Sequence, residues 1–239
     1  MSSGRDLETT CRPLLAAGPY PLTRPDARPH RSQFVRARAG SAVAIVAAFL
    51  LAAAMPAQAG RLGHNPANDP RLLNKPIEDL SYDRATRCRS GAQPGAAALA
   101  DWISSHTRGE LWGINRCEKW GPHSASVHAE GRAIDYRLDA GIAKEKRAAM
   151  HLIHVFLEPD RNGNFAALAR RMGVQGLIFN CKAWFGGSGL GRYSACYKGN
   201  GKRDPHVDRT TAHKDHVHIE LNWKGARKKT SFWRSPLSR

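Results

Sequence analysis

The chain has 239 residues, of which 41% are hydrophobic, so it is long enough to bury one large core or two small ones. It carries 37 Lys and Arg residues against 20 Asp and Glu residues, a formal net charge of +17. The basic residues are scattered, and the sequence contains no DNA-binding motif and no aromatic-rich platform for single strands. We therefore do not expect nucleic acid as a partner, and the charge favours other polyanions, such as anionic lipid or acidic polymers.

The first 59 residues predict an export signal. An apolar run from Ala42 to Met55 is followed by the small-residue pattern Ala57-Gln58-Ala59, which is typical of a signal-peptidase cleavage site. Three arginines precede the run: Arg31, Arg36 and Arg38. The run is shorter than the roughly 20 apolar residues of a spanning helix. Residues 1–59 are thus expected to be an N-terminal extension and signal peptide, with an uncleaved anchor as the alternative.

The segment after the signal is expected to be a secreted, envelope-associated protein without a stable membrane span. It keeps 30 basic and 17 acidic residues, a net charge of about +13. Because an exported protein of this charge meets acidic cell-wall polymers first, we expect a wall partner. A monomer is expected.

Four cysteines remain once Cys11 is removed with the leader, and an even number in an exported chain indicates two disulfides. Three pairings are possible. We favour Cys88 with Cys117 and Cys181 with Cys196, because each pair closes a modest loop within one region of the chain. A four-thiolate zinc site is the alternative, but the sequence has no Cys-x-x-Cys pair.

The chain after the leader divides into an arm and one domain. Residues 60–79 are rich in Pro and Asn and predict an irregular arm, so the folded domain is expected at residues 80–239. Apolar spacing predicts a short helix over Gly95–Thr107, with Gly109 placed to stop it, and then a strand over Leu111–Cys117.

The second half of the domain gives the clearest periodic patterns. Ala143–Leu157 has apolar residues at helical spacing, and a second helix over Phe165–Met172 stops at Gly173. Val174–Asn180 predicts a buried strand, and Gly186–Asp204 predicts a long surface loop tied down by Cys196.

Residues 216–221 alternate polar and apolar side chains, which predicts a half-buried strand. With the other elements, it predicts an α+β fold: a small antiparallel sheet, flanked by helices, that carries a metal site.

Two segments are dense in side chains that bind metals. The first is Ser126 to Asp135, in which Gly131 allows a sharp turn or a close backbone approach, and the strand that follows places Asp135 on one face and Ile134 and Tyr136 on the other. The second is Asp215-His216-Val217-His218, where a period of two puts both histidines on a single face.

Two imidazoles and a carboxylate that converge on one point suit Zn²⁺, with a fourth position left for water. Such an ion lowers the pKa of water to about 7 and polarises carbonyls, which indicates a hydrolytic centre. The residues leave the general base open between Asp215 and His216, and Glu130 is a weaker rival that is expected to face solvent.

The pattern S-x-H-x-x-G-x-A-x-D over Ser126–Asp135, followed by D-H-x-H over Asp215–His218, resembles the superfamily of D-alanyl-D-alanine metallopeptidases, murein endopeptidases and the signalling domain of Hedgehog. The resemblance spans residues 116–222. Two segments within this range, Gly176–Asn180 and Thr211–Asp215, resemble most a wall-associated actinobacterial subgroup whose substrate is not established.

The resemblance implies roles for individual residues. It implies that His128, Asp135 and His218 bind zinc. It further implies that Asp215 matches the catalytic base of the dipeptidase branch and His216 the active-site histidine of the endopeptidase branch. Arg116 lies where relatives often keep an arginine that holds the substrate or polarises its carbonyl.

The expected function is zinc-dependent hydrolysis of amide bonds in peptidoglycan peptides, of carboxypeptidase or endopeptidase type. The alternative is a module that keeps the fold and the zinc but only binds wall polymer or a protein. A secreted effector that uses the same chemistry on neighbouring cells is a third reading. The position of Asp215 and His216 relative to the metal discriminates the enzyme from the binding module.

Overall fold

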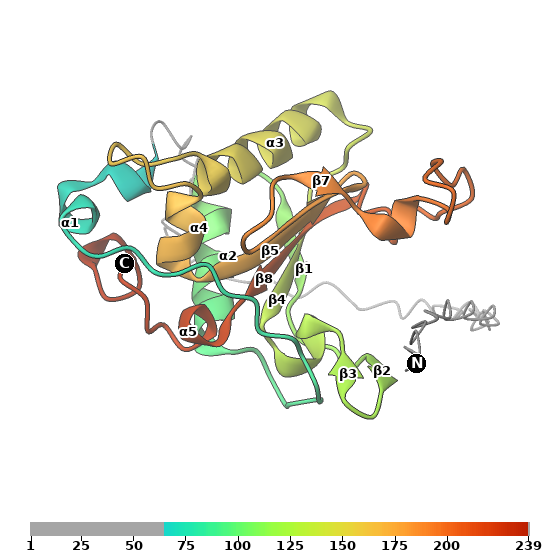
Figure 1. Ribbon diagram of the computed structural model, residues 1–239, viewed down its shortest axis with the longest axis horizontal. Coiled ribbons are helices and arrows are strands. Elements are labelled where there is room, and N and C mark those ends of the chain that lie inside the picture. The colour runs from blue at the N-terminus through green and yellow to red at the C-terminus, as the bar shows by residue number, and fades with distance from the viewer. Residues whose placement is uncertain (1–64, 239) are drawn as a thin grey trace, which may run out of the picture. The chain divides into compact units, whose positions relative to one another are not determined.

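The computed structural model describes residues 65–238, and the predicted signal segment and Cys11 lie outside them. The described residues form an α+β fold, as predicted, around a six-stranded antiparallel sheet (Figure 1). Across the sheet the strands are β1 (Glu110–Gly113), β4 (Ala133–Arg137), β8 (His216–Leu221), β5 (Val174–Phe179), β6 (Lys182–Phe185) and β7 (Gly191–Arg192). A separate hairpin joins β2 (Lys119–Gly121) and β3 (Ser124–Ala125).

The main helices lie over one face of the large sheet (Figure 1). They are α2 (Pro94–His106), α3 (Ala143–Leu157) and α4 (Ala167–Met172). Side chains alternate along a strand, so Ile134 of β4 and Val217 and Ile219 of β8 point into this helix-covered core, where each is fully buried. The polar residues between them, including Asp135 and His218, therefore point to the opposite face.

The chain enters the fold earlier than the sequence predicts. Pro66–Asn68 forms a 3₁₀ turn and Pro70–Leu73 a short helix, α1, whose first turns are capped by the side chains of Asn65 and Asp69. Ala67 and Leu72 are completely buried in the main core. The prediction of an irregular arm over residues 60–79 thus fails for residues 66–73, because capped turns let a Pro- and Asn-rich segment bury its few apolar residues, whereas residues 75–79 contain no helix or strand.

The predicted helices in the second half are present. α3 has the predicted bounds, whereas α4 begins two residues later than predicted, because Ala166 adopts a left-handed backbone (φ 50°) that cannot continue a helix. Gly173 ends α4 in a left-handed conformation, as expected of a C-terminal glycine. Within residues 65–238, no helix has both the length and the apolar character that crossing a membrane requires.

Three other segments depart from prediction. β1 stops at Gly113 and does not reach Cys117, because the next residues leave the sheet to contact the segment that carries His128. The strand at 216–221 is buried on both faces, not one, since neighbouring segments cover its polar side. The loop at 186–204 is largely exposed and tied down by Cys196 as expected, but it also contributes the short strand β7.

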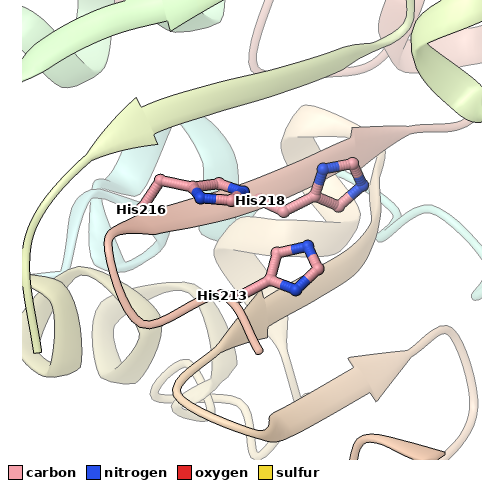
Figure 2. Close-up of side chains that lie close together, drawn as sticks. All are labelled: His213, His216 and His218. Carbon is pink, nitrogen blue, oxygen red and sulfur yellow. The ribbon is translucent and has the colours of Figure 1, made fainter. Parts of the chain in front are cut away.

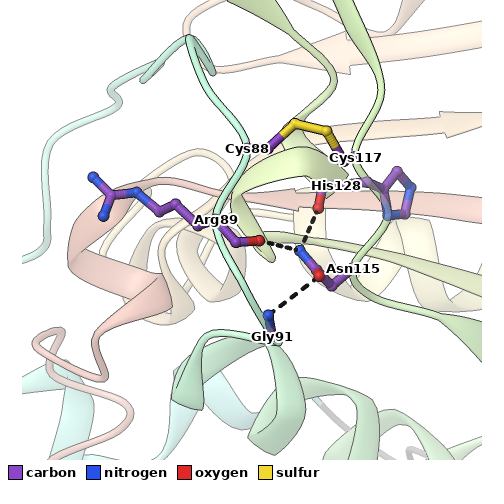
Figure 3. The surroundings of a disulfide bond; sticks show 6 residues. All are labelled: Cys88, Arg89, Gly91, Asn115, Cys117 and His128. Carbon is purple, nitrogen blue, oxygen red and sulfur yellow. Dashed lines mark hydrogen bonds between the residues drawn. A yellow bond between two sulfur atoms is a disulfide. The ribbon is translucent and has the colours of Figure 1, made fainter.

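Both favoured disulfides, Cys88–Cys117 and Cys181–Cys196, are present. Two such bonds indicate an oxidising, extracytoplasmic environment. The first bond joins two segments beside the carbonyl of His128 (Figure 3). There, the Asn115 amide donates to the carbonyl oxygens of Arg89 and His128 and accepts from Gly91 N–H, at 3.0–3.2 Å.

We expect the double substitution Cys88→Ser/Cys117→Ser to lower the free energy of unfolding by about 3–4 kcal/mol. The bond spans 29 residues, and the loss follows from the larger conformational freedom of the unfolded chain. Serine is tolerated because Cys88 is only half-buried and Cys117 is exposed. Urea unfolding of the oxidised protein and of the variant measures the difference, and a loss below about 1 kcal/mol would contradict the entropic account.

Candidate metal centre

His128 is presented by a tight 3₁₀ turn, Val127–Glu130, whose N-terminus is capped by the Ser126 hydroxyl. The turn ends at Gly131, which has φ +67° and lies so close to residue 91 that a Cβ atom would stand 2.1 Å from the Gly91 carbonyl oxygen. Only glycine fits there. The close approach predicted for Gly131 is therefore present.

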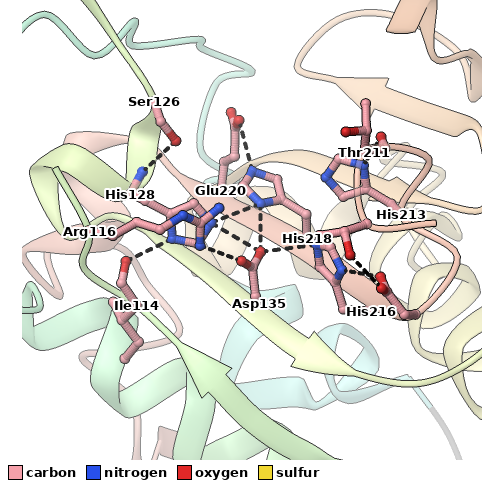
Figure 4. Close-up of polar contacts among 12 residues, drawn as sticks. Ile114, Arg116, Ser126, His128, Asp135, Thr211, His213, His216, His218 and Glu220 are labelled. Carbon is pink, nitrogen blue, oxygen red and sulfur yellow. Dashed lines mark hydrogen bonds and ion pairs between the residues drawn. The ribbon is translucent and has the colours of Figure 1, made fainter. Parts of the chain in front are cut away.

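Asp135 and His218 face each other across two paired strands. They are direct partners in the antiparallel register of β4 and β8, so their side chains project from the same face. Asp135 Oδ1 lies 2.9 Å from His218 Nδ1 and 3.0 Å from His128 Nε2, and the two histidine nitrogens are 3.1 Å apart (Figure 4). Two segments that are distant in sequence, one with His128 and Asp135 and the other with His218, thus bring three ligand-type atoms to one point.

This trio can hold a metal ion. Ligands about 2.0–2.1 Å from a tetrahedral ion stand about 3.3 Å from each other, close to the spacing found here. The three side chains are at most 8% exposed, so an ion between them would be shielded from bulk water on the protein side. Two imidazoles and one carboxylate are also a donor set that leaves room for a fourth ligand.

The atoms of the trio that point away from its centre are all held by hydrogen bonds. His128 Nδ1 donates to the Ile114 carbonyl oxygen at 2.9 Å, and His218 Nε2 donates to Glu220 Oε1 at 3.1 Å. Because both partners are oxygen acceptors, His128 Nε2 and His218 Nδ1 are the nitrogens that face the centre, and in the neutral rings they would offer their lone pairs to an ion. Arg116 Nη1 donates to the outer oxygen of Asp135 at 2.5 Å.

Glu220 is itself part of a buried network. Its second carboxylate oxygen accepts a hydrogen bond from the Gln175 amide at 3.3 Å. The Tyr82 hydroxyl also forms a hydrogen bond with the Glu220 carboxylate. Burial would raise the pKa of Glu220, but these hydrogen bonds and that of His218 lower it, so the group stays a carboxylate. The network fixes the ring of His218 from behind.

The electrostatics of the trio favour a cation. Burial opposes ionisation of Asp135, but hydrogen bonds from the surrounding histidines hold its pKa far below the usual range. Burial also opposes protonation of His218, yet Asp135 and Glu220 raise its pKa to about 9. The ion-free site thus keeps a proton between two carboxylates, and a metal ion would displace that proton on binding.

His216 is a further polar neighbour of the trio. Its Nε2 lies 3.4 Å from Asp135 Oδ1, and its Nδ1 donates to Asp215 Oδ1 at 2.8 Å. Thr210 Oγ1 donates to the other Asp215 oxygen at 2.7 Å, so the carboxylate is fixed on both sides. The structure therefore places the His216 ring next to the trio, and Asp215 on the far side of that ring, where it contacts Nδ1.

A cavity of about 400 Å³ opens beside these residues. Its lining residues are Trp112, Gly113, Arg116, Glu118, Asp135, Thr210 and His216. The Trp112 ring is 48% exposed and lies 5.7 Å from the ring of His216, centroid to centroid. Arg116 donates to two carboxylates of this lining, Asp135 and, from Nε at 2.6 Å, Glu118, and its remaining N–H groups can reach a molecule bound in the cavity.

Glu130 is not part of the site. Its side chain is 3% exposed and forms an ion pair at 2.8 Å with Arg132, which is completely buried. The expectation that Glu130 faces solvent is wrong, because the left-handed turn at Gly131 directs it inward towards that arginine.

Two residues of the site were missed by the sequence reasoning. Glu220 has the same strand parity as His216 and His218, so the period-two pattern could have placed it on the site face. His213 lies in a left-handed turn (φ 49°) before the strand, and its ring centroid is 4.7 Å from that of His216 (Figure 2). Strand periodicity does not extend to such a turn, and the sequence gives no other local signal for it.

We expect Glu220→Gln to weaken metal binding about 10- to 100-fold, because the neutral amide orients and polarises the imidazole of His218 less than a carboxylate does. Competition with a chromogenic chelator measures the dissociation constant. Glu110→Gln is a matched control, since that carboxylate is exposed and pairs only loosely with Arg137, at 3.7 Å. Equal affinities in the two variants would contradict a role for Glu220 in holding His218.

Comparison of the chain with family models, with characterised proteins and with solved structures finds no match.

Proposed function

We propose that this chain is an exported zinc-dependent peptidase that hydrolyses amide bonds in peptidoglycan peptides, as a carboxypeptidase or an endopeptidase. The observation that carries the proposal is the convergence of His128, Asp135 and His218, with His216 beside them. The resemblance of the two motifs to the D-alanyl-D-alanine metallopeptidase, murein endopeptidase and Hedgehog superfamily supports the same function.

Zinc is the metal that the donor set favours, since imidazole nitrogens with one carboxylate and an open position are typical of catalytic zinc. The ion, when bound, supplies a Lewis acid that polarises a carbonyl group and makes a water molecule more acidic. His128, Asp135 and His218 would hold it, while Ile114, Glu220 and Arg116 keep these ligands in place.

His216 is the proposed general base. Its Nδ1 hydrogen is committed to Asp215, so the lone pair of Nε2 is free to accept a proton from the attacking water. Asp215 and Thr210 hold the ring in this tautomer and stabilise the charge that protonation creates. The resemblance left the base open between Asp215 and His216, and the distances favour His216.

Arg116 and the cavity supply the proposed substrate contacts. The guanidinium can donate to a carbonyl or carboxylate oxygen of a peptide that lies in the cavity lined by Trp112 and His216. The net charge of about +13 over residues 60–239 supports peptidoglycan, which carries acidic groups, as the substrate. Five of the basic residues that make up this charge lie in the exposed loop over residues 186–209, against two acidic ones, Asp204 and Asp208: Arg192, Lys198, Lys202, Arg203 and Arg209. The disulfides and the predicted leader support export to the envelope.

A binding module with the same zinc site is the competing proposal. It predicts that no proton acceptor lies near the ion, whereas His216 Nε2 lies 3.4 Å from a ligand oxygen. This distance favours the enzyme.

Digestion of purified peptidoglycan from several wall types, followed by mass spectrometry of the soluble products, tests the proposal. We expect the zinc-loaded protein to release fragments that differ from the intact stems by cleavage of an amide bond. A chelator should stop the release, and added zinc should restore it. Intact stems after incubation with every wall type would contradict the proposal.

A further inference from the structure

The site contains more metal-binding atoms than one ion uses. Four histidines each have one ring nitrogen committed to an oxygen acceptor: His128 to Ile114 O, His218 to Glu220, His216 to Asp215 and His213 to Thr211 O. Each ring, in its neutral form, therefore has one remaining lone pair. A zinc ion at the trio occupies those of His128 and His218 only.

The two remaining imidazoles lie next to each other. His213 donates from Nδ1 to the Thr211 carbonyl oxygen at 3.0 Å, which leaves its Nε2 as the free nitrogen. The rings of Tyr193 and His213 pack perpendicular to each other, with centroids 5.1 Å apart. One nitrogen from each of His213, His216 and His218 lies within 4.8 Å of the others, which makes a second group able to hold a metal (Figure 2).

We propose that His213 and His216 form a second, weaker cation position beside the first, with Nε2 of each ring as a ligand. His218 cannot serve both ions, because its only free lone pair is directed at the trio. The second ion thus has two protein ligands and completes its coordination with solvent. Imidazole pairs suit borderline metals such as Zn²⁺, Cu²⁺ and Ni²⁺.

The second position has a regulatory consequence, which rests on the proposed function. An ion bound to His216 Nε2 occupies the lone pair that accepts the proton from water. Metal in excess of one equivalent therefore inhibits the peptidase, and a metal-buffered environment keeps it active.

Calorimetric titration of the metal-free, untagged protein with Zn²⁺ tests this inference. We expect two binding events, the second at least tenfold weaker than the first. His213→Asn and His213→Gly should weaken the second event at least tenfold and leave the first within about threefold. Both residues tolerate the left-handed backbone at this position, so the turn is preserved. His206→Asn, which removes an exposed histidine elsewhere, should keep both events.

The outcomes separate the two proposals. A single zinc equivalent in the unmodified protein, or a second event that both His213 variants retain, overturns the second position and leaves the proposed function standing. Loss of the first event only in His128→Ala assigns that event to the trio. A protein that binds two ions but releases no peptide at any zinc concentration contradicts the proposed function and keeps the second position.

Discussion

His128→Ala is expected to remove the tightly bound metal ion and, with it, peptide release from peptidoglycan. The substitution deletes one of three protein ligands at the centre of the site. Two ligands remain, so we expect metal affinity to fall by about 100-fold or more and hydrolysis to fall to the background of the metal-free protein. We measure metal content after dialysis by inductively coupled plasma mass spectrometry, and we measure peptide release on the same sample.

The control for this substitution must separate metal loss from unfolding, because His128 is completely buried. His128→Gln keeps much of the volume and a polar group facing the Ile114 carbonyl, and it should show the same loss of metal with less loss of stability. Thermal unfolding of the metal-free forms compares the variants directly. Full metal content in both His128 variants would mean that the trio is not the metal site.

His216→Ala is expected to lose turnover as well, but, unlike His128→Ala, to keep its metal ion. The ring lies beside the trio without belonging to it, so its removal leaves the three ligands in place. Loss of the proton acceptor should lower kcat about 10²- to 10⁴-fold. Digestion assays quenched at successive times, with zinc held at one equivalent, measure the rate of peptide release. Metal analysis verifies that each variant carries one zinc ion.

Asp215→Asn provides the graded comparison for His216. The amide keeps the shape of the side chain but can present its N–H₂ to the ring, so it favours the wrong tautomer of the imidazole. We expect a smaller loss of kcat than in His216→Ala, with metal content unchanged. If both variants digest peptidoglycan at the rate of the unmodified protein, His216 is not the base.

Much of the fold and of the candidate site could be predicted from the sequence, because the relevant signals are local and periodic. The alternation in Asp215–Leu221 placed both histidines on one face, and the direct pairing of Asp135 with His218 shows why these two segments meet. The helix at 143–157 has its predicted bounds for the same reason, since its pattern is long and uninterrupted.

The parts that could not be predicted depend on contacts between distant segments. Residues 65–73 resemble a linker in composition, and only their side-chain caps and their packing against the core make them part of the fold. The inward direction of Glu130 depends on the buried Arg132, and the position of His213 depends on a left-handed turn and on Tyr193. Periodicity carries no information about such contacts.

The most direct test of the central claim is anomalous diffraction at the zinc absorption edge from crystals of the zinc-loaded protein. We expect a strong peak about 2.0–2.2 Å from His128 Nε2, Asp135 Oδ1 and His218 Nδ1, present at one equivalent of zinc. A crystal of the loaded protein with no peak among these three atoms, or with its strongest peak elsewhere, would contradict the account.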